Sequence, residues 1–434
     1  MKAFIDLKQY KEILKILSFR SFFLALTYIV RFLLTFSLVR ILSQEDFGYY
    51  SWVMSTIMLF STLNIQGLDN YTLRKIAELK HDSKEKTMRF QYFVRSTILK
   101  NSAWNLVFLF FIFLIVQNTE LLGDMSINFS LLAIYALSLP FSSLTMVNAS
   151  TLRVNDYPRI AQIGDSFIQS SSLVVLVLFT FYFLEVNLST YYIIYLSICS
   201  WVISFLFTSY FHRKFNLPSK SFGKTSPSEW KKESLQIMLG VFGWVILSRG
   251  DVFILGFFVP SSELSSYFVS LRIAEVMLFL PSVCTYIWAG RVSNLFHEGN
   301  LIETQRILKL SSRLSFAMSF ILFAFGYFFS TEILNIFGEF YSTNTSILRW
   351  SLFSYLIISA VGIVGPMLLI VGQQKFLAIL QWSLGLSFMI CIIIIAPIYG
   401  IQGGVMLFCF FQLLASFMMV LKLKKITTLS TFQI

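Results

Sequence analysis

The sequence predicts an all-α polytopic membrane protein with about twelve transmembrane helices. Hydrophobic residues make up 56% of the 434 positions and charged residues 13%, and the mean hydropathy is +0.73. A soluble fold of this length would not have enough polar residues to cover its surface. The apolar segments are continuous runs of about 20 residues, which suit membrane helices rather than the ~10-residue alternating strands of a membrane β-barrel.

Twelve apolar runs account for most of the chain, and each is long enough to cross a bilayer once. The predicted spans are residues 16–42, 47–68, 97–117, 127–152, 160–184, 190–211, 235–259, 264–295, 314–337, 347–371, 376–398 and 401–421. The basic stretch before the first run leads into it without a small-residue cleavage site, so we expect the first run to be retained as a membrane helix.

Positive charges occupy every second gap between these runs. All but five of the 34 Lys and Arg residues fall in alternate gaps or at their near edges, for example in residues 69–96. Positive charge resists translocation, so these gaps and both termini are expected on the cytoplasmic side of a bacterial inner membrane. The same asymmetry explains the net charge of +12, which therefore does not indicate nucleic-acid binding.

The loop at residues 212–234 divides the spans into six and six. It contains six Lys and Arg residues and two prolines, a composition typical of a linker. We therefore predict an N-terminal lobe at residues 1–211, a cytoplasmic linker at 212–234 and a C-terminal lobe at 235–434. Six spans per half would give the two lobes the same orientation in the membrane, as parallel repeats.

An internal repeat supports this division. Ser43 and Glu45 precede the second run, and Ser261 and Glu263 precede the eighth run 218 residues later. The same offset relates Arg31 to an arginine in the seventh run, Arg249. Transporters built from such repeats bind their substrate between the halves.

Three arginines, Arg31, Arg249 and Arg272, lie deep inside apolar runs at similar depth near mid-membrane. An arginine in hydrocarbon costs at least ~2.5 kcal/mol and persists mostly where it lines a cavity or has a partner. Guanidinium groups are always charged and bind phosphates with several donors at once. We therefore predict that these three side chains form a substrate-binding site.

Acidic residues leave a second interpretation of these arginines open. Glu275 follows Arg272 by three residues, on the same helix face, so the two can form a structural ion pair. Asp251 lies two residues after Arg249, about 200° around the helix, and should not face it. Asp165, near the cytoplasmic end of the fifth run, is either a coupling carboxylate or a headgroup-level residue.

Helix breaks are expected at three prolines within the runs, Pro140, Pro281 and Pro366, which could act as hinges or as passive kinks. No metal site is predicted, since the three histidines and four cysteines are scattered. No GxxxxGK phosphate loop occurs, so neither direct ATP use nor any other cofactor is expected.

Several segments resemble the polysaccharide-biosynthesis flippases of the Wzx type, members of the multidrug/oligosaccharidyl-lipid/polysaccharide exporter superfamily. The similar segments are RILSQEDFGYYS at residues 40–51, GL at 67–68, RKIA at 74–77, DVFILG at 251–256 and APIYGIQGG at 396–404. The resemblance implies a two-lobed, MATE-like exporter. It further implies flipping of undecaprenyl-diphosphate-linked O-antigen, capsule or exopolysaccharide units, alongside a polysaccharide polymerase and a chain-length regulator.

Two other functions remain open at this stage. A cation-coupled multidrug exporter of the same superfamily would use intramembrane carboxylates, whereas this chain has an excess of mid-membrane arginines. A membrane polysaccharide polymerase would handle the same lipid-linked substrate, but it usually has a long external loop, and no external gap here exceeds about a dozen residues.

Overall fold

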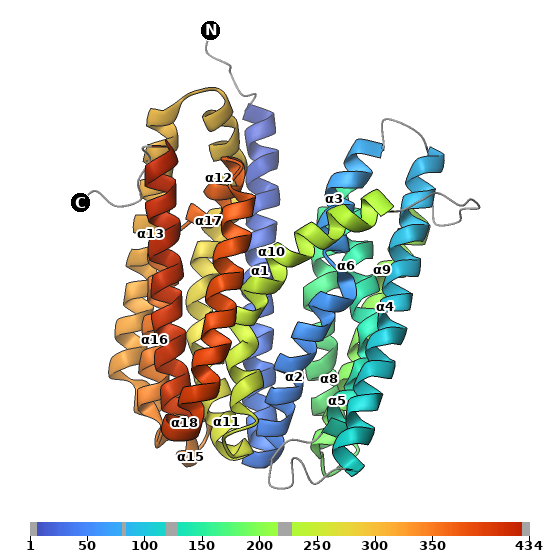
Figure 1. Ribbon diagram of the computed structural model, residues 1–434, viewed down its shortest axis with the longest axis vertical. Helices are drawn as coiled ribbons and strands as arrows, with labels where there is room; N and C mark the ends of the chain where they lie inside the picture. The colour runs from blue at the N-terminus through green and yellow to red at the C-terminus, as the bar shows by residue number, and fades with distance from the viewer. Residues whose placement is uncertain (1–6, 80–83, 119–128, 216–227, 428–434) are drawn as a thin grey trace.

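The computed structural model describes residues 7–79, 84–118, 129–215 and 228–427, and every regular element in these ranges is a helix (Figure 1). The elements of the first half are α1 (Leu7–Ile41), α2 (Gln44–Ile65), α3 (Leu68–Leu79), α4 (Lys84–Asn118), α5 (Phe129–Tyr135), η2 (Ala136–Ser138), α6 (Leu139–Val154), α7 (Pro158–Gln162), the π-helical η3 (Ile163–Phe167), α8 (Ile168–Tyr182) and α9 (Thr190–Lys214).

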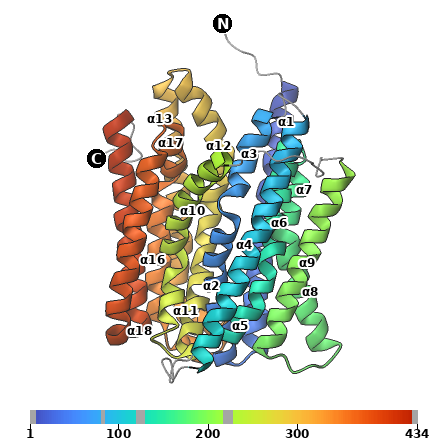
Figure 2. The same cartoon turned by 45° about the vertical axis from the view of Figure 1, so that its right-hand side comes forward.

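The second half continues with helices of similar length. Its elements are α10 (Ser228–Leu255), α11 (Ser261–Glu275), η4 (Val276–Leu278), α12 (Phe279–His297), α13 (Leu301–Phe328), α14 (Ser330–Phe337), α15 (Glu339–Ser342), α16 (Thr345–Val361), α17 (Val364–Ile370) and α18 (Gln374–Thr427). The start of α1 and the end of α18 lie at the same end of the bundle (Figures 1 and 2).

The prediction of an all-α polytopic membrane protein is confirmed. Ten of the described helical segments are long and apolar enough to cross a membrane. The last of them, α18, is two helices joined at Gly400, whose φ of 52° and ψ of −140° are not helical. α2 is not among these ten, because it is not apolar enough. Its buried Ser51, Ser55 and Thr56 face other helices instead of lipid.

The helices pack mainly within each half of the chain. In the N-terminal group (α1–α9), α9 packs on α6 and α8, while α1 packs on α8; in the C-terminal group (α10–α18), α18 packs on α10 and α16. α9 and α10 extend into the predicted linker at 212–234 from its two ends. Residues 216–227 of the linker lie outside the described residues. The exact lobe boundaries therefore remain a prediction.

The two groups meet closely at the end of the bundle opposite the start of α1 and the end of α18, where α2 packs against α10 and α11 (Figure 1). A Cβ atom at Gly48 would lie 1.8 Å from the carbonyl oxygen of Ser261, so only glycine allows this helix approach. The indole N–H of Trp52 donates to the Phe253 carbonyl oxygen at 3.0 Å. A hydrogen bond and a close backbone contact thus join the groups here.

Each of the three predicted prolines lies beside a break in its helix. The 3₁₀ segment η2 ends just before α6, which contains Pro140, and the 3₁₀ segment η4 ends just before α12, which contains Pro281. Pro366 lies in α17, which follows a break at Gly362 with φ of 64°. Three long spans are therefore segmented at positions where they can bend.

Candidate functional site

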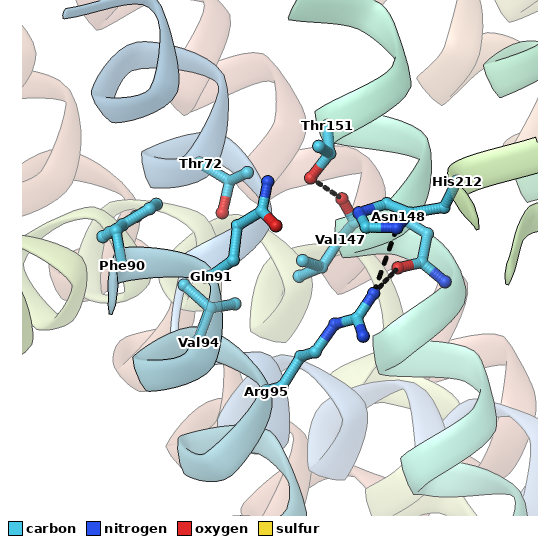
Figure 3. A pocket seen from close by; sticks show the side chains of 9 residues that line it. All are labelled: Thr72, Phe90, Gln91, Val94, Arg95, Val147, Asn148, Thr151 and His212. Carbon is cyan, nitrogen blue, oxygen red and sulfur yellow. Dashed lines mark hydrogen bonds between the residues drawn. The ribbon is translucent and has the colours of Figure 1, made fainter. Parts of the chain in front are cut away.

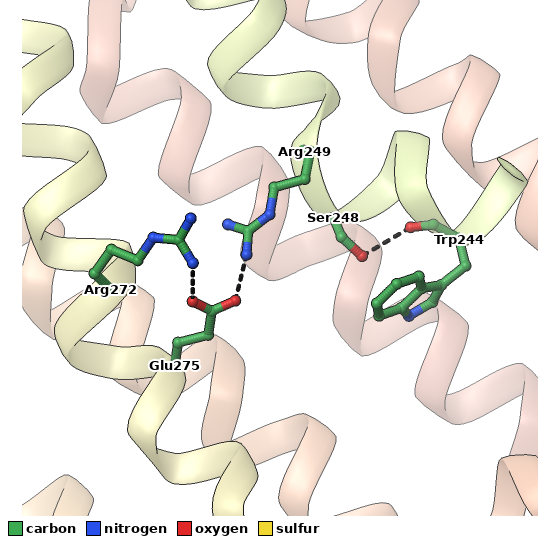
Figure 4. A network of polar contacts seen from close by, with 5 residues as sticks. All are labelled: Trp244, Ser248, Arg249, Arg272 and Glu275. Carbon is green, nitrogen blue, oxygen red and sulfur yellow. Dashed lines mark hydrogen bonds and ion pairs between the residues drawn. The ribbon is translucent and has the colours of Figure 1, made fainter. Parts of the chain in front are cut away.

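A carboxylate shared by two arginines forms the centre of the site (Figure 4). Glu275 is the last residue of α11, directly before η4. Its Oε2 accepts a hydrogen bond from Arg272 Nη1 at 2.6 Å, and its Oε1 accepts one from Arg249 Nη2. Since Arg249 belongs to α10, this carboxylate links two neighbouring helices at the point where one of them changes from α to 3₁₀ geometry.

The two arginines differ in how far they are enclosed. Arg249 is only 7% exposed, and its Nη1 is buried without a hydrogen-bond partner in the described structure. The Arg272 side chain is 27% exposed, and its guanidinium carbon lies 4.6 Å from the centre of the Phe268 ring. Arg249 is thus an enclosed partner of Glu275, whereas Arg272 retains an open side.

Arg31 completes the group from α1. Its side chain is exposed and makes no hydrogen bond or ion pair within the described residues, yet it interacts electrostatically with both Arg272 and Glu275. At ~1.5 Å per helical residue, Arg249, Arg31 and Arg272 lie roughly 9, 15 and 17 Å from the helix ends at residues 255, 41 and 261. The structure therefore places the three predicted arginines inside three different helices, α10, α1 and α11, with Arg249 and Arg272 joined through Glu275.

Asp251 does not pair directly with Arg249. This agrees with their helical spacing, which places the two side chains about 200° apart around α10. Its Oδ2 accepts a hydrogen bond from the Tyr267 hydroxyl at 2.6 Å, and its Oδ1 accepts one from the Val252 backbone N–H at 2.8 Å. Asp251 is fully buried, so these two bonds replace the water that an ionised carboxylate requires. The residue ties α10 to α11 beside the arginine group.

Asp165 lies apart from the central group, in the π-helical segment η3 of the N-terminal group. It forms an ion pair with Arg153 of α6. π-Helical turns often occur at functional sites, but they also fit one extra residue into a helix. The pair joins the last turn of α6 to the segment that follows α7.

A second polar cluster, around Arg95, was not predicted as a site (Figure 3). Arg95 of α4 points towards α6 and α9, and its Nη2 lies 3.3 Å from both Asn148 Oδ1 and His212 Nδ1. A cavity of about 10 Å³, also lined by Thr72 and Gln91, lies beside them. In the sequence, Arg95 belongs to the basic gap at 69–96, so its charge has an ordinary topological explanation, and no local signal indicates its partners.

The central group suits a polyanionic ligand. Three guanidinium groups and two carboxylates leave one excess positive charge when both acids are ionised. The unpartnered Nη1 of Arg249 is enclosed, so the donors that a ligand can reach are on Arg31 and Arg272. No cluster of three or more metal-ligating side chains occurs in the part of the chain that the structure describes. The chemistry available here is electrostatic binding by fixed N–H donors.

Several solved transporters share this fold. An inward-facing multidrug resistance MATE family transporter of the MOP superfamily superposes with a TM-score of 0.73 at 15% identity, over 93% of this chain and 94% of that one. Lipid II flippase MurJ, in an inward closed conformation, gives 0.73 at 16% identity, over 93% and 87%. A ligand complex of the MATE multidrug transporter DinF-BH gives 0.71 at 14% identity, over 97% of both chains.

These identities are low, so the structural likeness shows a MATE-like fold and no more. Sequence comparison goes further for part of the chain. Residues 19–287 match the family described as polysaccharide biosynthesis protein, which covers more than half of the chain. No curated protein matches the sequence.

Proposed function

Because the chain belongs to the polysaccharide biosynthesis protein family, a family of membrane transporters and not of enzymes, we propose that it is a flippase for lipid-linked oligosaccharides. The substrate would be an undecaprenyl-diphosphate-linked repeat unit of O-antigen, capsule or exopolysaccharide. The protein would move this unit from the cytoplasmic to the outer leaflet by alternating access. The polymerase alternative is set aside, because it is an enzyme.

The observation that supports this proposal best is the convergence of Arg31, Arg249 and Arg272 around Glu275. A diphosphate crossing a bilayer loses its hydration, which costs several kcal/mol per charge unless protein groups replace the water. We assign Arg31 and Arg272 to direct contact with the diphosphate, since both have open sides. Arg249 would hold Glu275 and thereby aim Arg272.

Glu275 also offers a route for coupling to helix motion. It sits at the junction of α11 and η4, so bending at this break would move Arg272 relative to Arg249. A bound diphosphate would compete with Glu275 for the guanidinium donors and favour a different helix geometry. Binding would thus bias the two-state equilibrium that alternating access requires.

The membrane potential favours the outward direction. With the cytoplasm negative, exporting two negative charges gains ~4.6 kcal/mol per 100 mV, at ~2.3 kcal/mol per charge. We place the protein in a bacterial cytoplasmic membrane with both termini cytoplasmic, on the alternation of basic gaps. A polysaccharide polymerase and a chain-length regulator would then use its product.

A cation-coupled multidrug exporter is the second candidate, because two of the similar structures are multidrug transporters. Such a transporter needs carboxylates that are free to exchange a cation. Here Glu275 is engaged by two arginines and Asp251 by Tyr267, and the local charge is positive. These contacts favour an anionic substrate.

The proposal is tested by Arg31→Ala and Arg272→Ala in reconstituted vesicles and by surface polysaccharide in cells. Each change removes hydrogen bonds to a charged group, worth ~1.5–3 kcal/mol, so flipping should fall roughly tenfold or more. Arg→Lys should restore only part of the activity, because lysine lacks the planar fork. Arg306→Ala, at a side chain that is 80% exposed, is the control and should flip normally. Normal flipping by both site variants at matched protein levels would contradict the proposal.

A further inference from the structure

A hollow of about 470 Å³ lies at the end of the molecule opposite the start of α1 and the end of α18. Three parts of the C-terminal group line it: the first turn of α11, the α15–α16 junction and the turn inside α18, all near the lower end of Figure 1. The lining residues are Ser262, Glu263, Phe340, Asn344, Tyr399, Gly400, Ile401 and Gln402. On the predicted topology, this end faces the outside of the cell.

The backbone at Gly400 creates one wall of the hollow. Its φ of 52° with ψ of −140° reverses the chain between the two helices of α18, a conformation that residues with a Cβ rarely adopt. The turn leaves Tyr399 65% exposed beside the hollow. These residues belong to the segment at 396–404 that resembles the flippase family, and the arginine site makes no use of them.

Several polar side-chain atoms of the lining have no protein partner within the described residues and are accessible to solvent. Gln402 Nε2 donates to Ser346 Oγ at 2.8 Å, which fixes the amide in place while its oxygen has no partner among the described residues. The carboxylate of Glu263 forms no hydrogen bond or ion pair in the same ranges, and it lies 3.8 Å from where a Cβ of Gly400 would be. A ligand with many hydroxyl groups can use such oxygen acceptors, together with the amide of Asn344.

We propose that this hollow binds the sugar portion of the transported molecule on the outer side. Sugars combine hydroxyl groups, which match the amides and carboxylate, with apolar C–H faces, which match the rings of Tyr399 and Phe340. The volume lies within the range of small-molecule sites, about 300–1,000 Å³, and is sufficient for a short oligosaccharide. This inference rests on the proposed flippase function and deepens it.

The hollow and the arginine site differ in charge, so they should bind ligands of different charge. Its lining includes Glu263 and no basic side chain, so it disfavours a diphosphate. The arginine group has the opposite charge and no exposed amide. The two sites would therefore bind different parts of the substrate, with the diphosphate at the arginines and the sugar at the outer hollow.

Binding is tested with the purified protein in nanodiscs. The probe is the oligosaccharide released by mild acid from the lipid-linked precursors of the source strain, and binding is followed by saturation-transfer NMR. Tyr399→Ala should weaken binding about three- to tenfold, since it removes one ring face. Ile398→Ala, at an exposed neighbour outside the lining, should bind like the parent. Sodium pyrophosphate should not compete for this site.

A second measurement guards against misfolded variants. A cysteine at Asn344 in a cysteine-free background should react with an impermeant thiol reagent added to intact cells, and the oligosaccharide should slow that reaction. Equal reaction rates with and without sugar, or equal sugar binding by Tyr399→Ala and the parent, would overturn the inference. A Tyr399→Ala variant that loses only co-purification with the polymerase would also overturn it, in favour of a protein partner.

The outcomes also separate this inference from the proposed function. If Arg31→Ala abolishes flipping while the hollow binds no oligosaccharide, the flippase proposal stands and the outer sugar site is wrong. If the parent protein does not flip lipid-linked oligosaccharides, the proposed function fails first. If both hold, Tyr399→Ala should slow flipping less than Arg31→Ala does, because the sugar contact follows passage through the arginine group.

Discussion

Two polar clusters, one around Glu275 and one around Arg95, satisfy the charges of their arginines in opposite ways. At the level predicted to be mid-membrane, Arg249 and Arg272 share the carboxylate of Glu275. In the N-terminal group, the half-buried Arg95 hydrogen-bonds to two neutral acceptors, Asn148 and His212, and to no carboxylate in the described ranges. Arg95 lies in a predicted cytoplasmic gap, where water can solvate part of its guanidinium, whereas a mid-membrane arginine needs an opposite charge. Depth in the bilayer thus determines which partners suffice.

The two clusters also differ in the helices that they join. Glu275 lies at a helix break, and its partner Arg249 is on the preceding helix, so the pair can separate when α11 and α12 bend. Arg95 joins three helices, α4, α6 and α9, whose contacts within the N-terminal group hold them side by side. We expect the first cluster to change during transport and the second to remain fixed.

The largest effect is expected from Glu275→Gln. This change leaves Arg249 buried without a counter-charge, and breaking a buried pair costs ~3–5 kcal/mol. The free energy of unfolding in detergent, measured by chemical denaturation, should fall accordingly. Arg249→Gln combined with Glu275→Gln should recover most of the loss, because Arg272 has an open side. Combining Arg272→Gln with Glu275→Gln should not, since Arg249 stays unpaired. An equal recovery by both double variants would show that the carboxylate does not hold Arg249.

Periodicity and charge were sufficient to predict much of the fold. The long apolar runs require helices that satisfy their own backbone groups in lipid, which fixes the secondary structure before any packing is considered. Proline removes a backbone donor, so the breaks beside Pro140, Pro281 and Pro366 follow from local chemistry. The close approach at Gly48 could not be predicted, because the α2–α11 contact joins residues more than two hundred positions apart.

The site was only partly predictable. The cost of charge in lipid singled out Arg31, Arg249 and Arg272, and the i,i+3 spacing indicated the Arg272–Glu275 pair, which the structure contains. The bond between Arg249 and the same carboxylate depends on how α10 packs beside α11, which no local pattern encodes. That these residues bind substrate is still a prediction.

A smaller effect is expected from Arg95→Met. This change leaves Asn148 Oδ1 and His212 Nδ1 without their donor, and each lost hydrogen bond is worth ~0.5–1.5 kcal/mol. The unfolding free energy should drop by roughly 1–3 kcal/mol, while flipping at matched protein levels should remain near normal. Arg89→Met, which removes a pair with Glu85, whose side chain is 66% exposed, is the control and should change stability by less than ~1 kcal/mol. Loss of flipping in a stable Arg95→Met protein would place this cluster in the transport cycle.

The smallest effect is expected from Asp165→Asn, which tests whether the N-terminal group contains a coupling carboxylate. Asp165 pairs with Arg153, whose side chain is 33% exposed, so solvent screens the interaction. Partly exposed pairs contribute ~0–1 kcal/mol, and asparagine keeps an oxygen that can still accept from the guanidinium. Stability should therefore change by less than ~1 kcal/mol.

If Asp165 exchanged a proton or cation during each cycle, Asn would abolish flipping without unfolding the protein, because an amide cannot bind and release a proton in this pH range. We expect instead that initial flipping rates in vesicles, measured with and without imposed proton and sodium gradients, match those of the parent. A rate that loses its gradient dependence in Asp165→Asn would assign coupling to the N-terminal group and confine the Glu275 network to substrate binding.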